Sequence, residues 1–243
     1  GRTLADCLES RVTPDVERPH FLSIFEQICQ TMAYAHAKGV IHRDLKPSNV
    51  MVGSFGEVQI MDWGLAKVLS KGGGADDERS GRDLPGDPGV STWRSDDAGS
   101  DSAVGSIMGT PAYMPPEQAR GKVQLISERS DVFGLGTILC EILTGKPPYT
   151  GESAEDVYRK AKEGNLGDAV QRLDACGADD ELVEIARSCL RENARERPRN
   201  AIVVAKKMQS YLESLEARAR QFELRTARTR LRLLLALLVA VAS

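Results

Sequence analysis

The sequence predicts a mainly α-helical domain, α+β overall, in which a bundle of helices surrounds one buried central helix and carries short β-hairpins. Three observations support this prediction: an apolar run at residues 130–149, helical spacing of apolar residues in 18–39, and two strand-like segments within 49–62. With 243 residues, 41% of them hydrophobic, the chain is long enough for one large domain or two small ones with an ordinary core.

The first predicted helix covers residues 18–39. Its apolar residues recur at spacings of three and four, and Gly39 follows them as a C-terminal cap. This face consists of Phe21, Ile24, Phe25, Ile28, Met32 and Ala35. Residues 49–62 then show two short strands, NVMV and EVQIM, joined by a turn at residues 53–56. We therefore expect a buried helix that leads towards a small hairpin.

The run SDVFGLGTILCEILTGKPPY at residues 130–149 is apolar on almost all sides and predicts a fully buried helix. Gly134 and Gly136 each cost a helix about 1 kcal/mol, and Pro147 and Pro148 should end it. Further helical patterns cover residues 152–163, 179–192 and 200–232, without an internal repeat. Most of the chain is thus expected to be helical.

Composition argues against several functional classes. The 32 basic and 35 acidic side chains leave a net charge of −3, so we expect no nucleic-acid partner. The 5 cysteines are scattered without a C-x-x-C pair, and only 3 histidines accompany them, which argues against a zinc site or a disulfide framework. We infer a reducing, cytosolic compartment.

Residues 70–106 form a segment rich in glycine, serine and acidic side chains. Such a composition cannot offset the entropy of folding by burial, so we expect this insertion to be disordered. Its seven serines and Thr92 are either phosphorylation targets or incidental hydroxyls of a tolerated surface insertion.

The segment IHRDLKPSNVMV at residues 41–52 places charged and amide side chains between apolar anchors. Phosphoryl transfer needs a carboxylate near the acceptor hydroxyl, oxygen ligands for Mg²⁺ and a cation on the migrating phosphate. Asp44 is placed to deprotonate the hydroxyl, and Lys46 to neutralise the γ-phosphate. The Asn49 amide oxygen can bind a metal, and so can Asp62, which follows a strand in VQIMDWGLA. Asn49 begins the first strand of the hairpin and Asp62 follows the second, so the two side chains should meet at one cleft.

These motifs make the chain resemble the C-terminal lobe of a eukaryotic-type protein kinase, of the kind found in membrane-bound bacterial Ser/Thr kinases. The resemblance covers residues 1–215 and rests on HRDLKPSN, DWG, GTPAYMPPE and SDVFGLG, in that order. It implies that Asp44 is the catalytic base and that Asn49 and Asp62 hold Mg²⁺, or Mn²⁺, with ATP. It further implies that Met51 lies under the adenine and that the Thr110 hydroxyl bridges Asp44 and Lys46.

The same resemblance implies a substrate class. Lys46, two residues after the catalytic aspartate, and the residues Gly109, Thr110 and Pro111 are similar to Ser/Thr rather than Tyr kinases, so we expect protein Ser or Thr hydroxyls as acceptors. Self-phosphorylation in trans is a further expectation. Arg43 resembles the arginine of kinases whose activation segment is ordered by a phosphate. The segment in question is here the serine-rich stretch downstream of Asp62.

Other motif residues are expected to hold the lobe together. By the resemblance, Glu117 pairs with Arg197, and Asp131 accepts hydrogen bonds from the catalytic-loop backbone. His42 should pack beneath the site without titrating in catalysis. For His20 and His36 nothing in the sequence favours a functional role over a solvated or satisfied side chain.

The chain also departs from the family pattern. It contains no G-x-G-x-x-G loop and no V-A-I-K lysine, which belong to an N-terminal lobe that we expect to precede Gly1, so the chain alone should not catalyse. Trp63 replaces the usual Phe, and Pro115 replaces Ala.

The C-terminal region predicts a location. Arginines concentrate in a basic juxtamembrane helix at residues 216–230 and reach Arg232, and residues 231–243 are almost entirely apolar. Thirteen apolar residues fall short of the ~20 that cross a bilayer, so we expect either the start of a membrane span or a surface helix that binds anionic lipid. Either arrangement places the lobe on the cytoplasmic side of the cell membrane, and a single-pass protein is expected.

We therefore predict a Ser/Thr protein kinase that transfers the γ-phosphate of ATP to protein hydroxyls. A membrane-tethered pseudokinase scaffold is the alternative. A third reading is a lipid-binding module that uses the lobe only as a support.

Overall fold

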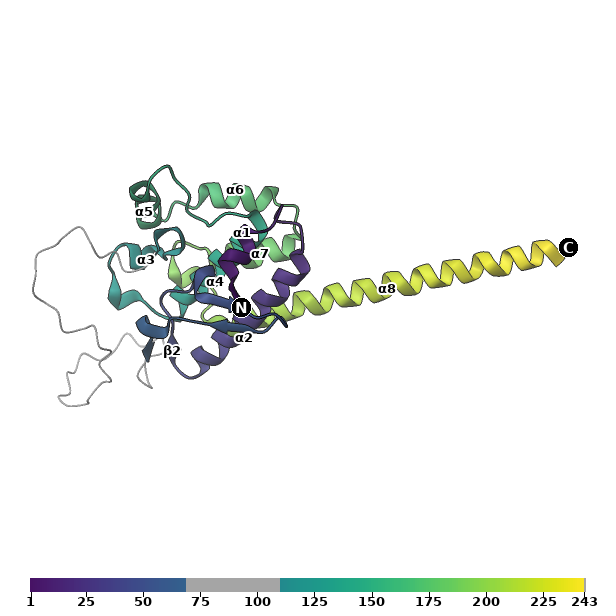
Figure 1. Cartoon of the computed structure of the whole chain (residues 1–243), viewed down its shortest axis with the longest axis horizontal. Coiled ribbons are helices and arrows are strands. Elements are labelled where there is room, and N and C mark those ends of the chain that lie inside the picture. The colour runs from purple at the N-terminus through teal and green to yellow at the C-terminus, as the bar shows by residue number, and fades with distance from the viewer. Residues whose placement is uncertain (69–109, 243) are drawn as a thin grey trace, which may run out of the picture.

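The computed structural model describes residues 1–68 and 110–242, and beyond residue 230 it describes the backbone alone. Two predictions lie outside the described residues: disorder in residues 70–106 and the apolar side chains of the expected membrane span at 231–243. The described chain is mainly helical with small sheets (Figure 1).

The predicted helices are present with shifted ends. They are α2 (Arg18–Ala37), α4 (Glu128–Thr144), α5 (Ala154–Glu163), α7 (Asp180–Cys189) and α8 (Ala201–Ala242). Gly39 follows α2 in the left-handed conformation, as expected of a C-terminal cap. The end of α4 is a correction: Gly145, with φ 73°, ends this helix before the two prolines.

Several shorter helical elements were not predicted. They are α1 (Leu4–Glu9), α3 (Pro116–Ala119), α6 (Gly167–Ala175) and the 3-10 turns η1 (Pro47–Asn49), η2 (Trp63–Leu65), η3 (Pro111–Tyr113), η4 (Val123–Leu125) and η5 (Ala194–Glu196). Helix α1 begins at a capping box, in which the Thr3 hydroxyl accepts from the Asp6 amide and the Asp6 carboxylate accepts from the Thr3 amide, each at 3.1 Å. Local capping thus specifies a helix too short for apolar periodicity to reveal.

Two small antiparallel sheets frame the loop that carries the motif residues. The predicted hairpin consists of β3 (Val50–Val52) and β4 (Val58–Ile60), and β1 (Arg2–Thr3) extends it in the order β1-β3-β4. The second sheet pairs β2 (Val40–Ile41) with β5 (Lys67–Val68). Residues 42–49 leave β2 and enter β3, so the motif loop is anchored at both ends by strands.

Helix α4 is buried along nearly its whole length and packs against α2, α6, α7 and α8. Such burial explains its apolar sequence, because a helix with neighbours on all sides has no face for polar residues. The motif loop lies directly on this helix, where a Cβ added at Gly134 would come within 2.9 Å of the Leu45 Cβ. The fold thus positions the loop on a rigid support.

The first part of α8 packs on α2, and the helix then runs far out from the body of the molecule (Figure 1). Met208 and Tyr211 are buried in the core, whereas nearly every side chain from 216 to 230 is exposed. Among the described residues, no helix combines the length and the apolar character needed to span a bilayer.

Candidate active site

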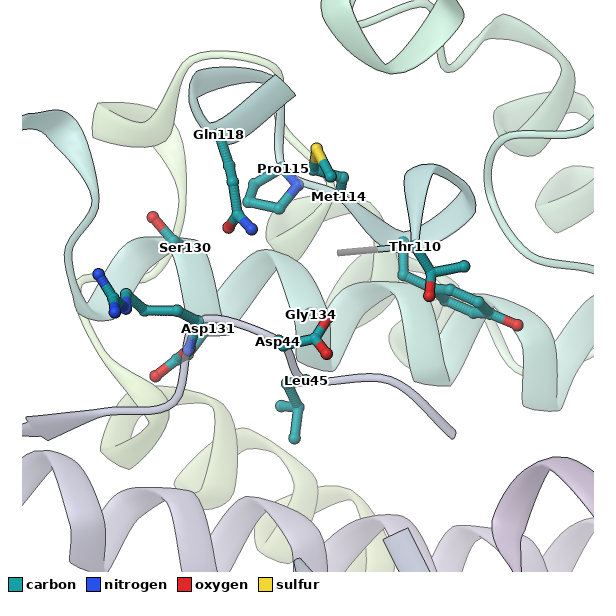
Figure 2. Close-up of a pocket in the computed structure, with 11 residues that line it drawn as sticks. Asp44, Leu45, Thr110, Met114, Pro115, Gln118, Ser130, Asp131 and Gly134 are labelled. Carbon is teal, nitrogen blue, oxygen red and sulfur yellow. The ribbon is translucent and has the colours of Figure 1, made fainter. Parts of the chain in front are cut away.

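Three predicted site residues form one hydrogen-bonded cluster. The Lys46 ammonium donates to Asp44 Oδ2 at 2.8 Å and to the Thr110 hydroxyl at 3.1 Å. We expected Thr110 to bridge the other two, and instead Lys46 is the residue that joins them. Figure 2 shows Asp44 and Thr110 among the side chains that line one pocket. The sequence therefore identified the members of the cluster but not their order.

Asn49 belongs to the same cluster. Its amide nitrogen donates to the main-chain oxygen of Asp44 at 2.8 Å and to Asp44 Oδ2 at 3.1 Å. These bonds turn the nitrogen towards the aspartate, so the amide oxygen remains as the atom that can bind a cation. Oδ2 of Asp44 is thus held by two donors, which fixes the orientation of the carboxylate.

The β3–β4 hairpin brings Asp62 to the same end of the fold. Val50 lies opposite Ile60, and the ladder continues one step further because the Met61 amide donates to the Asn49 carbonyl at 2.7 Å. Asp62 follows immediately, exposed and in the left-handed conformation, with φ 56° and ψ 59°. The expectation that strand ends bring Asn49 and Asp62 to one place is confirmed for the backbone.

The donor set suits a magnesium ion. Amide and carboxylate oxygens are hard ligands, and Mg²⁺ in proteins is commonly bound by one or two carboxylates together with substrate phosphates and water. Asn49 and Asp62 supply oxygens of this kind. Met51, predicted to lie under the adenine, is half-buried in β3 opposite Gln59.

Asp131 holds the backbone of the motif loop from below. Its Oδ2 accepts from the His42 amide at 2.7 Å and its Oδ1 from the Arg43 amide at 2.8 Å. Arg43 has φ 71°, a conformation that is uncommon for a residue other than glycine. A buried carboxylate that accepts both amides offsets the cost of this backbone, and the predicted role of Asp131 is confirmed.

His36 extends this buried network to α8. Its Nε2 lies 2.9 Å from Asp131 Oδ2, and its Nδ1 accepts from the Ala201 amide at 3.0 Å. Because Nδ1 accepts, Nε2 carries the proton and donates to the carboxylate. The sequence assigned His36 no role, and only its place on the buried face of α2 could have suggested one.

His42 is fully buried beneath the site, as predicted. Its Nδ1 accepts from the Asp44 amide at 3.3 Å, and its Nε2 lies 2.9 Å from the Met61 carbonyl. The imidazole therefore joins the motif loop to the segment that carries Asp62. Arg43 makes a second such connection, because its Nε donates to the Leu65 carbonyl.

Two ionisable groups near the pocket were not singled out from the sequence. Tyr113 lines the pocket, and its phenol interacts with the Glu141 carboxylate of α4. Burial raises the pKa of the Glu141 carboxyl, and Tyr113 and Arg11 partly oppose this rise. Burial also raises the pKa of the Tyr113 phenol. A glutamate inside an otherwise apolar helix was the signal for this site.

Comparison with known proteins agrees with this geometry. The family model for the protein kinase domain matches residues 1–210. The serine/threonine-protein kinase PknD of Protochlamydia amoebophila is 32% identical over 192 residues, which are 79% of this chain and 18% of that protein. The serine/threonine-protein kinase PknB of Mycobacterium tuberculosis is 32% identical over 166 residues, 67% of this chain and 22% of that protein.

A third relative, the serine/threonine-protein kinase PknD of Chlamydia abortus, is 41% identical over 138 residues, 57% of this chain and 14% of that protein. The chain thus spans about a fifth of the length of the curated relatives that it matches. The family match, the relatives and the cluster around Asp44 agree, and the chain belongs to the protein kinase family, among the bacterial eukaryotic-type Ser/Thr kinases.

Proposed function

We propose that this chain carries the catalytic loop and metal ligands of a Ser/Thr protein kinase, which transfers the γ-phosphoryl group of ATP to a protein hydroxyl. The observation that supports this most directly is the cluster of Asp44, Lys46, Asn49 and Thr110, joined by hydrogen bonds of 2.8 to 3.1 Å. The names of the relatives support the same reaction class.

Asp44 is the proposed catalytic base. Lys46 and Asn49 both donate to its Oδ2, which leaves Oδ1 to accept the proton of the incoming hydroxyl. Lys46 extends from this carboxylate to Thr110, so its positive charge lies where a transferring phosphoryl group needs neutralisation.

Asn49 and Asp62 are the proposed ligands of Mg²⁺, or of Mn²⁺, that accompanies ATP. The metal ion supplies positive charge that stabilises the phosphate oxygens during transfer. Met51 is the proposed contact for the adenine. The role of the chain is to hold two oxygen ligands at one end of a short hairpin, beside the base.

Protein serines and threonines are the proposed substrates, and self-phosphorylation in trans is part of the proposal. The Lys46–Thr110 contact and the Ser/Thr class of the relatives support this choice of substrate class. Arg43 is the proposed contact for a phosphate on the serine-rich segment. Its guanidinium already reaches the Leu65 carbonyl, close to the beginning of that segment.

The domain division is also a proposal: a kinase lobe at residues 1–215, a basic helix at 216–230 and an apolar segment at 231–243. Because the chain has no G-x-G-x-x-G loop and no V-A-I-K lysine, turnover by this chain alone is not expected. Anchorage at the cytoplasmic face of the cell membrane stays a prediction from the arginines and the apolar segment. Fractionation of cells that express the intact gene product tests it.

The experiment for the proposed reaction measures phosphate transfer from ATP to a serine-containing protein by the intact gene product. Asp44→Asn should lower kcat by about 10²- to 10⁴-fold, because general-base catalysis contributes about that much. Asp168→Asn, an exposed carboxylate on α6, is the control and should change kcat little. An intact gene product that consumes no ATP, with or without the substitution, would contradict the proposal and favour the scaffold.

A further inference from the structure

The side chain of Trp63 forms a hydrogen bond that closes a short loop around the proposed metal ligand Asp62. The indole Nε1–H donates to the Ile60 carbonyl at 2.9 Å, so a bond from the residue after Asp62 returns to the residue two before it. Asp62 itself has φ 56°, a left-handed conformation that is uncommon outside glycine, although aspartate and asparagine adopt it more readily than other residues. A backbone of this kind persists only where its surroundings hold it.

The Trp63 ring also contacts the motif loop. It lies edge-on to the His42 imidazole, with ring centroids 4.7 Å apart and planes inclined by 66°. The same imidazole lies 2.9 Å from the Met61 carbonyl through Nε2. Both neighbours of Asp62 in the chain are therefore held by one fully buried histidine.

We propose that Trp63 is a positioning residue that holds Asp62 in the conformation in which its carboxylate binds the metal, and that the indole N–H is the group responsible. This inference rests on the proposed function of Asp62. Phenylalanine, which the family pattern has at this place, offers a ring to His42 but no donor to Ile60. The extra hydrogen bond should favour the metal-binding conformation of Asp62.

Packing alone is the simpler explanation for a tryptophan at this position. If the ring only fills space, Trp63→Phe lowers the stability of the whole lobe and loosens all of its elements together. If the N–H holds Asp62, the same substitution loosens residues 58–68 selectively. The two explanations therefore differ in where the structure opens, rather than in whether it is destabilised.

Hydrogen exchange of the chain itself, followed by mass spectrometry, separates them. The informative amides are Met61, bonded to Asn49 at 2.7 Å, and Ala66, bonded to Trp63 at 2.9 Å. In Trp63→Phe we expect exchange of residues 58–68 to accelerate about 2- to 10-fold, the factor that one net hydrogen bond gives, with α4 unchanged. Tyr34→Phe, which removes an exposed phenol hydroxyl from α2, is the control. Unchanged exchange in 58–68, or equal acceleration in α4, overturns the proposal.

The Mg²⁺ requirement of the intact gene product supplies a second readout. Trp63→Phe should raise the half-saturating Mg²⁺ concentration by up to about tenfold, and excess Mg²⁺ should restore the rate, because a bound metal shifts the population back to the competent conformation. An unchanged requirement, or a loss that excess Mg²⁺ does not restore, overturns the proposal. If the intact gene product does not transfer phosphate at all, the proposed function fails, and the exchange measurement still decides whether Trp63 holds this segment.

Discussion

Arg197 and Glu117 lie 80 residues apart in the sequence and form a two-point ion pair, with Nη1 2.8 Å from Oε1 and Nη2 2.9 Å from Oε2. Both side chains are buried, at 3% and 5% exposure. The Ser130 hydroxyl donates to the same Oε1 at 2.8 Å, and the guanidinium lies over the Phe133 ring at 4.7 Å. The pair thus joins the segment before α8 to α3 and α4, and the pairing that the family resemblance implied is confirmed.

Loss of one member of this pair should be costly. Arg197→Met leaves the Glu117 carboxylate buried without its counter-ion, and we expect the free energy of unfolding to fall by about 3 to 5 kcal/mol. Urea denaturation of the chain measures it. Arg218→Met, which removes an exposed guanidinium 3.6 Å from Asp179, should cost only about 0 to 1 kcal/mol. Equal costs for the two substitutions would show that burial does not govern the pair.

Gly134→Ala should destabilise the protein although alanine is the better helix former. The added Cβ would lie 2.9 Å from the Leu45 Cβ and 3.0 Å from the Leu45 carbonyl oxygen, so the motif loop would have to move off α4. We expect a loss of about 1 to 3 kcal/mol in urea denaturation. The control is Gly167→Ala in α6, where a Cβ has no neighbour closer than 3.7 Å. There alanine should raise stability by about 0.4 to 1 kcal/mol because it narrows the conformations open to the unfolded chain, and stabilisation at both positions would contradict the argument.

Thr110→Val should slow phosphate transfer. Valine keeps the shape of threonine but removes the hydroxyl that accepts from Lys46 at 3.1 Å, so the ammonium loses one of the two contacts that orient it. We expect kcat of the intact gene product to fall about tenfold, which corresponds to one hydrogen bond to a charged group. Thr110→Ser keeps the hydroxyl and should retain most of the rate. A serine variant as slow as the valine variant would mean that the methyl group, and not the hydroxyl, matters.

Glu141 should make stability depend on pH. Because burial raises the pKa of its carboxyl in the folded state, the folded chain favours the protonated form, and the stability associated with that form is lost as the pH rises through this raised pKa. Glu141→Gln should therefore raise Tm relative to the unsubstituted chain at pH 7, and the difference should shrink as the pH falls below about 4, where unfolded carboxyl groups are protonated too.

The matched control for this titration is Glu213→Gln on α8. Glu213 is exposed and accepts from Gln209 at 2.9 Å. Its substitution should change Tm by a similar small amount at every pH. A Glu141→Gln variant that is less stable at pH 7 than at pH 4, relative to the unsubstituted chain, would reverse the expected sign and refute a raised pKa.

The sequence by itself determined the helices with strong apolar periodicity, the β3–β4 hairpin and the members of the hydrogen-bonded cluster around Asp44. Periodicity reports which face of a helix is buried, and the order and spacing of HRDLKPSN and DWG specify which side chains share a site. The pairing of Glu117 with Arg197 and the role of Asp131 were implied by the family resemblance. These features depend on residue type and spacing, which are local properties of the chain.

Only the tertiary structure decided which of these side chains touch. It placed Lys46, rather than Thr110, at the centre of the cluster, and it joined His36 to both Asp131 and the start of α8 across 165 residues of sequence. It also explained the glycine at position 134, because the motif loop approaches α4 there too closely for a side chain. Contacts between distant segments depend on how helices pack, and a packing arrangement leaves no periodic trace in the sequence.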